Sequence, residues 1–173
     1  MDSFDFIGYM RDCAVRLTDI RHDESQPRFF RISGISQLEE LLSCLPQAHT
    51  PALLVENNTD GRVGDANRSD NFLDIPYHVF YVILKAAIND HDAIQQAKRE
   101  SKRIGFKILG RMLHDRRHYA HGLVMLNFDS IAYQSVGPLG DHCFGTMFSF
   151  TVSNGADLGY HEADWLPVFQ PLP

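Results

Sequence analysis

The chain has 173 residues, of which 44% are hydrophobic and 22% are charged. This composition is that of a globular protein and excludes an intrinsically disordered chain, and the length predicts a single domain with one sizeable core. The formal net charge of −6 argues against nucleic acid as the main partner, because proteins that neutralise phosphates usually carry a basic excess.

The three cysteines, Cys13, Cys44 and Cys143, are far apart and form no CxxC pair. Their number and spacing predict no disulfide framework and favour a reducing compartment. The opening "MDSFDFIGYM" carries acidic residues and lacks a long apolar core, so it does not resemble a secretory signal. No stretch reaches the ~18 uninterrupted apolar residues of a membrane span. We therefore expect the protein to be located in the cytoplasm of the cell that makes it.

Residues 1–48 are predicted to be mostly helical. A helix is expected over 3–20, capped by Asp2 or Ser3, because apolar residues recur at helical spacing along it. After a polar break, residues 28–33 predict a short strand. A second helix is expected over 36–45, where the sequence begins with the spacing of a capping box and is followed by Pro46.

Residues 49–155 are predicted to form a sheet and one long helix. Strands are expected over 51–58 and 72–86, joined by a loop rich in Asn, Asp and Gly. Between residues 77 and 84 the second strand is apolar on both faces, which indicates that both faces are covered. The chain's own helices are expected to cover one face, and a neighbouring subunit is one candidate for the other.

The longest predicted helix begins at Asn89 or Asp90 and runs to about Asp115, with apolar residues at three- and four-residue steps. Two strands, 122–136 and 143–153, follow as an antiparallel pair. Residues 156–173 are predicted to be an irregular tail that contains the one tryptophan, Trp165. The order of elements predicts an α+β fold, with one mostly antiparallel sheet and helices packed on one face.

Two groups of residues raise the alternative of a small ligand- or metal-binding module or an enzyme. His114, His118 and His121 are spaced four and three apart, and the first two would share a helix face. No cysteine lies near them and the HExxH pattern is absent, so a solvated helix end is favoured.

The second group is the triplet from Asp141 to Cys143. A catalytic cysteine needs a histidine base facing it. His142 and Cys143 are adjacent, and adjacent strand residues point to opposite faces. A turn edge with a half-buried thiol is therefore favoured over a reactive site, and we predict no cofactor, no metal and no catalytic residue.

The loop between residues 58 and 72 and a basic run over 98–107 are two candidate sites for ions. Asp60, Asp65 and Asp70 are five residues apart, without the tight spacing and final Glu of a calcium loop. The loop is expected to be a solvent-exposed hairpin loop that serves as an interaction arm. The run "KRESKRIGFK" over 98–107 includes Glu100 and predicts a solvated helix face.

The segments "DIPYHVFYVILKA", "DHDAIQQAKRESKRIGFKILGRMLHD" and "LNFDSIAYQSVGPLGDHCFGTMFSFTVS" together resemble small tail-completion and tail-terminator proteins of tailed bacteriophages and prophages. The resemblance covers residues 50–155. It implies a structural protein rather than an enzyme, which forms an oligomeric ring at the tail end or neck and contacts other tail or neck proteins. It also implies a location in the host cytoplasm during assembly and in the virion afterwards.

We expect the interaction surface to include apolar strand residues, the polar loop, the turn before Cys143 and the tail. A further alternative is an adaptor that binds a larger protein through the tail around Trp165. The expected interaction residues are Tyr77, Val79, Tyr81, Asp60, Arg62, Asp65, Arg68, Asp141, His142 and Trp165.

Overall fold

The computed structural model describes residues 4–33, 43, 45–57, 60–65, 72–140 and 142–165. The helix predicted over 36–45 lies outside the described residues, apart from Ser43 and Leu45. Arg68 and Asp141, which we expected to contact partners, also lie outside them.

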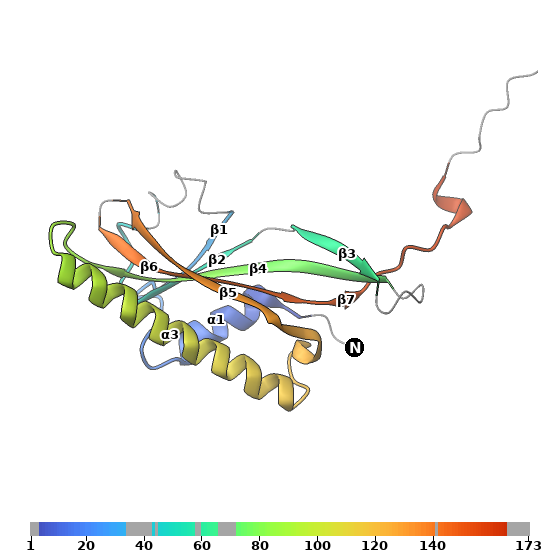
Figure 1. Cartoon of the computed structure of the whole chain (residues 1–173), viewed down its shortest axis with the longest axis horizontal. Helices are drawn as coiled ribbons and strands as arrows, with labels where there is room; N and C mark the ends of the chain where they lie inside the picture. The colour runs from blue at the N-terminus through green and yellow to red at the C-terminus, as the bar shows by residue number, and fades with distance from the viewer. Residues whose placement is uncertain are drawn as a thin grey trace, which may run out of the picture.

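Helices and strands follow the predicted order (Figure 1). The helices are α1 (Phe6–Arg16) and α3 (His91–Arg117), with short 3₁₀ turns η1 (Leu123–Met125) and η2 (Glu162–Asp164). The strands are β1 (Phe29–Ile32), β2 (Ala52–Glu56), β3 (Gly61–Asp65), β4 (Phe72–Lys85), β5 (Leu126–Leu139), β6 (Cys143–Val152) and β7 (Asn154–Gly155). The fold is α+β, as predicted.

The sheet is built around β4, the strand that pairs with most of the others. Its main path runs β1-β2-β4-β6-β5, while β3 and β7 pair with the first part of β4. All pairings are antiparallel except that of β1 with β2. Residues 72–76 of β4 therefore lie in a three-stranded arm with β3 and β7, which extends beyond the helices in Figure 1.

Strand β3 is the main departure from the sequence prediction, which placed residues 61–65 in a loop. Glycine at two of its five positions gives it little intrinsic preference for a strand. It pairs in register with the start of β4, from Gly61 opposite Pro76 to Asp65 opposite Phe72. Its glycines allow this close approach, because a Cβ at Gly64 would lie 2.7 Å from Cδ1 of Ile75.

Both long helices cover the same face of the sheet (Figure 1). Helix α1 begins at Phe6, three residues later than predicted, because the carboxylate of Asp5 accepts a hydrogen bond from the amide of Gly8 at 2.9 Å. Helix α3 has the predicted cap, Asp90, which accepts from the amide of Ala93 at 2.9 Å. The first apolar core lies between these helices and the inward side chains of β2, β4 and β6.

A second, smaller core lies on the opposite face of the sheet. It packs residues of β1, β2 and β4 against the segment that precedes β2. Its buried members are Ile32, Leu45, Ala48, Ala52, Leu54, Tyr81, Ile83 and Cys143. Strand β4 thus contributes to a core on each face, which confirms that its apolar character on both sides reflects burial on both sides.

Helix α3 approaches β6 closely at Ser101 and Gly105. The hydroxyls of Ser101 and Thr146 are 2.8 Å apart, and both residues are buried, so they satisfy each other inside the first core. A Cβ at Gly105 would lie 2.1 Å from the Phe148 ring. Only glycine leaves room for the helix to rest on this ring.

We expect Gly105→Ala to lower the free energy of unfolding. The Phe148 ring stacks on Phe80, with centroids 4.9 Å apart, and so has little room to move. Overpacking a core costs about 1–3 kcal/mol, which exceeds the ~1 kcal/mol that alanine gains over glycine in a helix. On the same helix, Gly110→Ala meets no heavy atom within 4 Å and should stabilise by up to about 1 kcal/mol. Denaturant unfolding of both variants gives the two signs, and equal signs would contradict the packing described.

Candidate functional site

On the face of the sheet opposite the helices, the chain buries the side chains at one end and leaves those at the other end partly exposed. At the closed end Tyr81 and Ile83 are buried in the second core. Towards the arm, Val79 is half-buried and Tyr77 is 43% exposed. Of the β4 residues predicted to contact a partner, Tyr77 and Val79 are therefore the two that the chain leaves at least partly exposed.

Tyr81 does not belong to that surface, contrary to the sequence prediction. Its side chain is 1% exposed, and its hydroxyl donates a hydrogen bond to the carboxylate of Glu56 on the neighbouring strand. Burial, followed by this hydrogen bond, raises the pKa of Tyr81 above its ordinary value. Tyr81 therefore links β4 to β2 within the chain. The alternation of residues along β4 shows which side chains share a face, but not which of them other segments of the chain cover.

Neighbouring strands extend this surface, which is only partly covered: Val79 and Met147 are half-buried against the edge of the second core. Residues paired across strands share a face, and in this sheet Val79 pairs with Ser149, which pairs with Ala132. None of these residues is charged, and none is fully buried. We call this surface the open face; its members are Tyr77, Val79, Ala132, Gln134, Met147 and Ser149.

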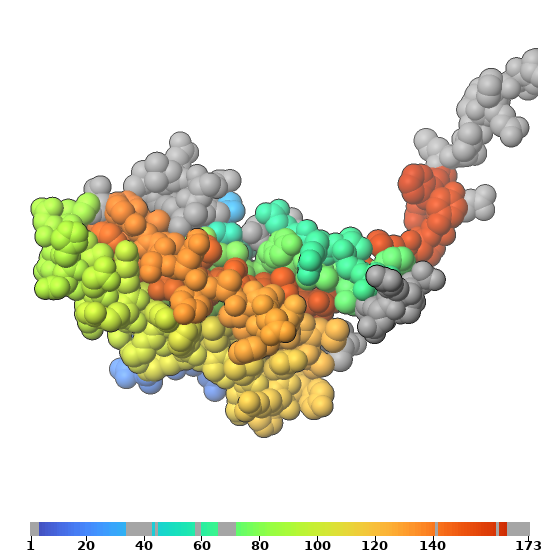
Figure 2. All heavy atoms as spheres, viewed as in Figure 1, coloured from blue at the N-terminus to red at the C-terminus, as the bar shows by residue number. Residues whose placement is uncertain are grey.

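The arm formed by β3, β4 and β7 carries the predicted polar contact residues. Asp60, Arg62 and Asp65 are all exposed, and Val63 between them is 61% exposed. In Figure 2 the arm lies at the end of the molecule from which the C-terminal segment departs. The arm therefore presents charged and apolar side chains well away from the two cores.

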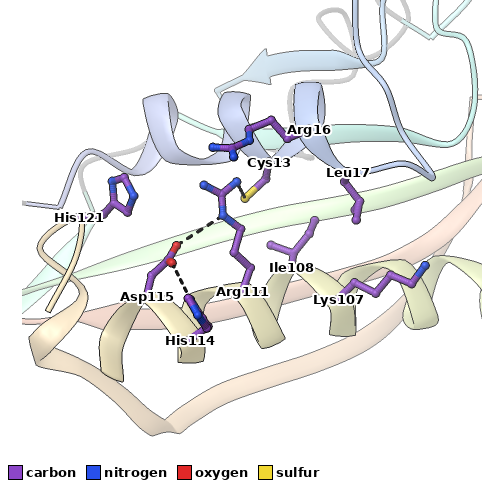
Figure 3. Close-up of a pocket in the computed structure, with 9 residues that line it drawn as sticks. All are labelled: Cys13, Arg16, Leu17, Lys107, Ile108, Arg111, His114, Asp115 and His121. Carbon is purple, nitrogen blue, oxygen red and sulfur yellow. Dashed lines mark hydrogen bonds and ion pairs between the residues drawn. The ribbon is translucent and has the colours of Figure 1, made fainter. Parts of the chain in front are cut away.

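A cleft with a volume of about 430 Å³ lies between α1 and α3 in the helical layer (Figure 3). Its lining residues are Cys13, Arg16, Leu17, Lys107, Ile108, Arg111, His114, Asp115 and His121. Five of these nine are basic or histidine side chains, so the cleft is a candidate anion site.

The positive charges of this cleft already have carboxylate partners. Arg111 lies 2.6 Å from Asp12 on α1 and 3.4 Å from Asp115 on its own helix. Lys107 lies 2.6 Å from Asp19, in the turn after α1. The pairs of Arg111 with Asp12 and of Lys107 with Asp19 connect α3 to α1 and its following turn, and the pair of Arg111 with Asp115 lies within α3. The network therefore stabilises the helical layer, and its carboxylates neutralise these two basic side chains.

Two further groups complete this junction. The hydroxyl of Tyr9 donates to Asp115 at 2.8 Å, and the guanidinium of Arg111 lies 5.1 Å from the centre of the Tyr9 ring. Burial tends to raise the pKa of Asp115, but hydrogen bonds from Tyr9 and His114 and the charge of Arg111 outweigh it and lower the pKa. Asp115 is therefore a carboxylate at neutral pH that accepts hydrogen bonds.

Cys13, at the back of the cleft, is not placed as a nucleophile. Burial raises the pKa of its thiol to about 11, although the charge of Arg111 opposes this. The Nη1 of Arg111 donates to its sulfur at 3.6 Å. A thiol with this pKa is protonated at neutral pH, and the thiolate is the reactive form.

The three histidines of the alternative prediction do not converge on one point. His114 and His118 are close, with ring centroids 4.2 Å apart, and Nδ1 of His118 bonds the carbonyl oxygen of His114 at 2.7 Å. His121 instead packs on the ring of Tyr9, with centroids 5.4 Å apart, and Figure 3 shows it entering the cleft from another element. Among the residues that the structure describes, no group of three His, Cys, Asp or Glu side chains is placed to hold a metal ion.

His142, in the turn before β6, and Cys143, the first residue of β6, lie in different environments. His142 is exposed, whereas Cys143 is 2% exposed and belongs to the second core. Burial raises the pKa of the Cys143 thiol, outweighing the opposing charge of Lys85. His142 remains an interaction candidate, and Cys143 is a core residue.

Trp165 lies near the end of the described chain and is 63% exposed. Its ring stacks on Tyr160, with centroids 5.8 Å apart and planes 21° from parallel. In Figure 2 this segment extends away from the rest of the molecule. The expected contact role of Trp165 thus falls on a segment that its own body does not cover.

Sequence reasoning missed the junction of Tyr9, Asp12, Arg111 and Asp115. Arg111 and Asp115 are four apart on the predicted helix, which is the one signal that the sequence offered. The partners on α1 are about a hundred positions away, and nothing local indicates them.

The chain matches no model of a known protein family, and no curated protein matches it. Of the described helices, none combines the length and apolar character needed to cross a membrane. The open face, the arm and the C-terminal segment each expose a large apolar side chain, namely Tyr77, Val63 and Trp165.

Proposed function

We propose that this chain is a structural assembly protein of a bacteriophage or prophage tail or neck, which self-associates into a ring that completes or caps the tail tube. It acts by contact and not by catalysis, and its partners are further copies of itself and other tail or neck proteins. In this proposal it assembles in the host cytoplasm and ends in the virion. Support comes from the resemblance over residues 50–155, together with the uncovered surfaces of the sheet.

The open face is the observation that carries the proposal. A soluble domain usually covers or charges an exposed sheet surface, but this one presents Tyr77 and Val79 beside uncharged neighbours. Burying apolar area stabilises by about 25 cal/mol per Å², so association through this surface is favourable. A second copy of the chain is the simplest partner for such a surface.

The edge strand β5 has the same character. It is 14 residues long and pairs only with β6 among the described strands. From residue 130 to residue 140 it carries no charged side chain. Natural edge strands are commonly protected by charges, by proline or by bulges, and here only Pro138 and the two register shifts do so. An edge of this kind is suited to contact with a neighbouring subunit.

We expect the purified chain to sediment as an oligomer and Val79→Arg to shift it towards monomer. The substitution places a charge at the centre of the open face without removing a fully buried side chain. Sedimentation equilibrium over a range of concentrations measures the change. Gln95→Arg, on an exposed position of α3, is the matched control and should leave the mass unchanged.

A wild-type chain that stays monomeric at high concentration would refute the self-association. The phage role has its own test, which is the identity of the adjacent reading frames. We expect genes for a tail tube, a tape measure or a portal beside this one, and a gene neighbourhood without any virion component would argue against a tail protein.

A further inference from the structure

A second cleft, of about 350 Å³, lies where α3 ends and the chain turns into η1. It is lined by Leu113, Arg116, Arg117, Tyr119 and Val124, and we call it the α3-end cleft. Its character is both apolar and basic. The ring of Tyr119 is 79% exposed, although a large aromatic side chain gains from being covered.

The two arginines of this cleft are available for a ligand. Arg116 and Arg117 are exposed, and neither forms an ion pair with an acidic side chain in the part of the chain that the structure describes. This distinguishes them from the earlier α3 residues Arg111 and Lys107, which are paired with Asp12 and Asp19. Unpaired guanidinium groups beside apolar side chains suit an anionic ligand with aromatic rings.

The C-terminal segment 156–165 has the complementary composition. Its sequence, "ADLGYHEADW", combines three acidic residues with Leu158, Tyr160 and Trp165. These three apolar side chains are 52%, 72% and 63% exposed. The segment is thus acidic and aromatic, and its apolar side chains are largely uncovered.

The body of the chain holds this segment only at its start. The amide of Ala156 donates to the carbonyl oxygen of Phe72 at 2.9 Å, which is the last backbone hydrogen bond to the sheet among the described residues. Beyond it the contacts of the described residues are local, such as His161 with Asp157 at 3.6 Å and Tyr160 with Trp165. In Figures 1 and 2 the segment points away from α3, so it does not occupy the α3-end cleft of its own chain.

We propose that segment 156–165 of one copy docks in the α3-end cleft of a second copy. The acidic side chains meet Arg116 and Arg117, and the Tyr160–Trp165 stack packs against Tyr119 and its apolar neighbours. The contact joins two different surfaces, so each copy both donates a tail and receives one. Repetition of such a head-to-tail contact closes into a ring when the rotation between copies permits it. The inference rests on the proposed self-association and supplies one of its contacts.

The one tryptophan of the chain makes Trp165 a direct reporter of docking. The emitting chain carries Arg116→Glu and Arg117→Glu, so it keeps its tail and loses its cleft. The receiving chain carries Tyr160→Ala and Trp165→Ala, so it keeps its cleft and emits no tryptophan fluorescence. Adding the receiving chain to the emitting chain should shift the emission of Trp165 to the blue and lower its quenching by acrylamide severalfold.

Two controls keep this experiment decisive. A receiving chain that also carries Arg116→Glu and Arg117→Glu should cause no shift, whereas one with Arg116→Lys and Arg117→Lys should retain part of it, because the charge remains. All substituted residues are exposed, and circular dichroism melts check that the variants fold. If mixing causes no shift, the proposal is wrong. This holds if Trp165 of the wild type is freely quenched, and it also holds if Trp165 is protected at every dilution because it docks in the cleft of its own chain.

The outcome is separable from that of the proposed function. If the wild type sediments as an oligomer but Trp165 reports no transfer between chains, the tail contact is wrong and the open face accounts for the association. If Trp165 reports transfer while Val79→Arg leaves the mass unchanged, the tail contact stands and the role given to the open face fails. A shift that survives reversal of both arginines refutes the α3-end cleft as the receiving site.

Discussion

We expect Phe148→Ala to lower the free energy of unfolding by about 3–5 kcal/mol, the usual cost of removing a buried aromatic side chain. Phe148 is fully buried in the first core. Its ring stacks on Phe80 at 4.9 Å, with planes 9° from parallel, and Gly105 of α3 closes over it. Loss of the ring leaves a cavity at the point where helix and sheet are closest, and rigid strands on either side limit collapse into it.

Denaturant unfolding monitored by circular dichroism measures this effect as a lower midpoint with an unchanged slope. Phe128→Ala is the matched control, because Phe128 is 52% exposed and lies on the edge strand β5. Its effect should stay within about 0.5 kcal/mol, as for other surface substitutions. A Phe148→Ala variant that loses less than the control would show that the two helices do not rest on this ring.

We expect acid to destabilise the protein through His78. The effect begins near pH 6.5, above the pH range in which carboxylates usually titrate. The imidazole packs among Phe4, Phe6 and Phe150, with ring centroids 5.4, 4.7 and 5.3 Å away. Burial among these uncharged rings lowers the pKa of His78 to about 4 from its ordinary 6.5. The folded state therefore binds the proton less readily than the unfolded state.

The direction of the pH effect follows from this difference. Above pH 6.5 His78 is neutral in both states and adds no pH dependence. As the pH falls from 6.5 towards 4, the unfolded chain takes up a proton that the folded chain does not, and stability falls by about 1.4 kcal/mol per pH unit, to a total of about 3 kcal/mol. Below pH 4 both states are protonated and the loss levels off.

Comparison with His78→Leu isolates this contribution. Leucine is close to histidine in volume and cannot be charged, so the variant should lose less stability between pH 6.5 and 4 than the wild type does. Asp19 and Asp115 have pKa values lowered by their hydrogen-bond partners, so their contribution is lost only at still lower pH. Unfolding midpoints at several pH values give the two curves, and parallel curves would show that the imidazole is hydrated in the folded state.

The sequence was most informative where structure follows from local spacing. The steps of three and four residues and the cap at Asp90 predicted α3 almost to its ends, and strict alternation predicted β6. The apolar character of residues 77–84 predicted a strand covered on both faces, and side chains of β4 are buried in a core on each side of the sheet. These properties depend on neighbours a few positions away, and helix periodicity and strand alternation are set at that range.

The sequence did not predict contacts between residues that are far apart along the chain. The parallel pairing of β1 with β2 and the strand character of residues 61–65 depend on partners that supply the hydrogen bonds, and the glycines of β3 give no signal of their own. The pairing of Arg111 with Asp12 likewise joins residues 99 positions apart. Charged residues are common on helix surfaces, so the sequence did not indicate which of them meet.

The sequence by itself determined the class of fold, the long helix and the existence of a strand buried on both sides, because each follows from side-chain periodicity along one segment. Only the tertiary structure decided that Tyr81 is enclosed while Tyr77 is left partly exposed, and that Trp165 lies off the body. It also decided that Arg111 pairs with a carboxylate whereas Arg116 and Arg117 pair with none among the described residues. Exposure and charge pairing depend on which distant segments pack over a residue, and that is a property of the assembled chain rather than of any stretch of it.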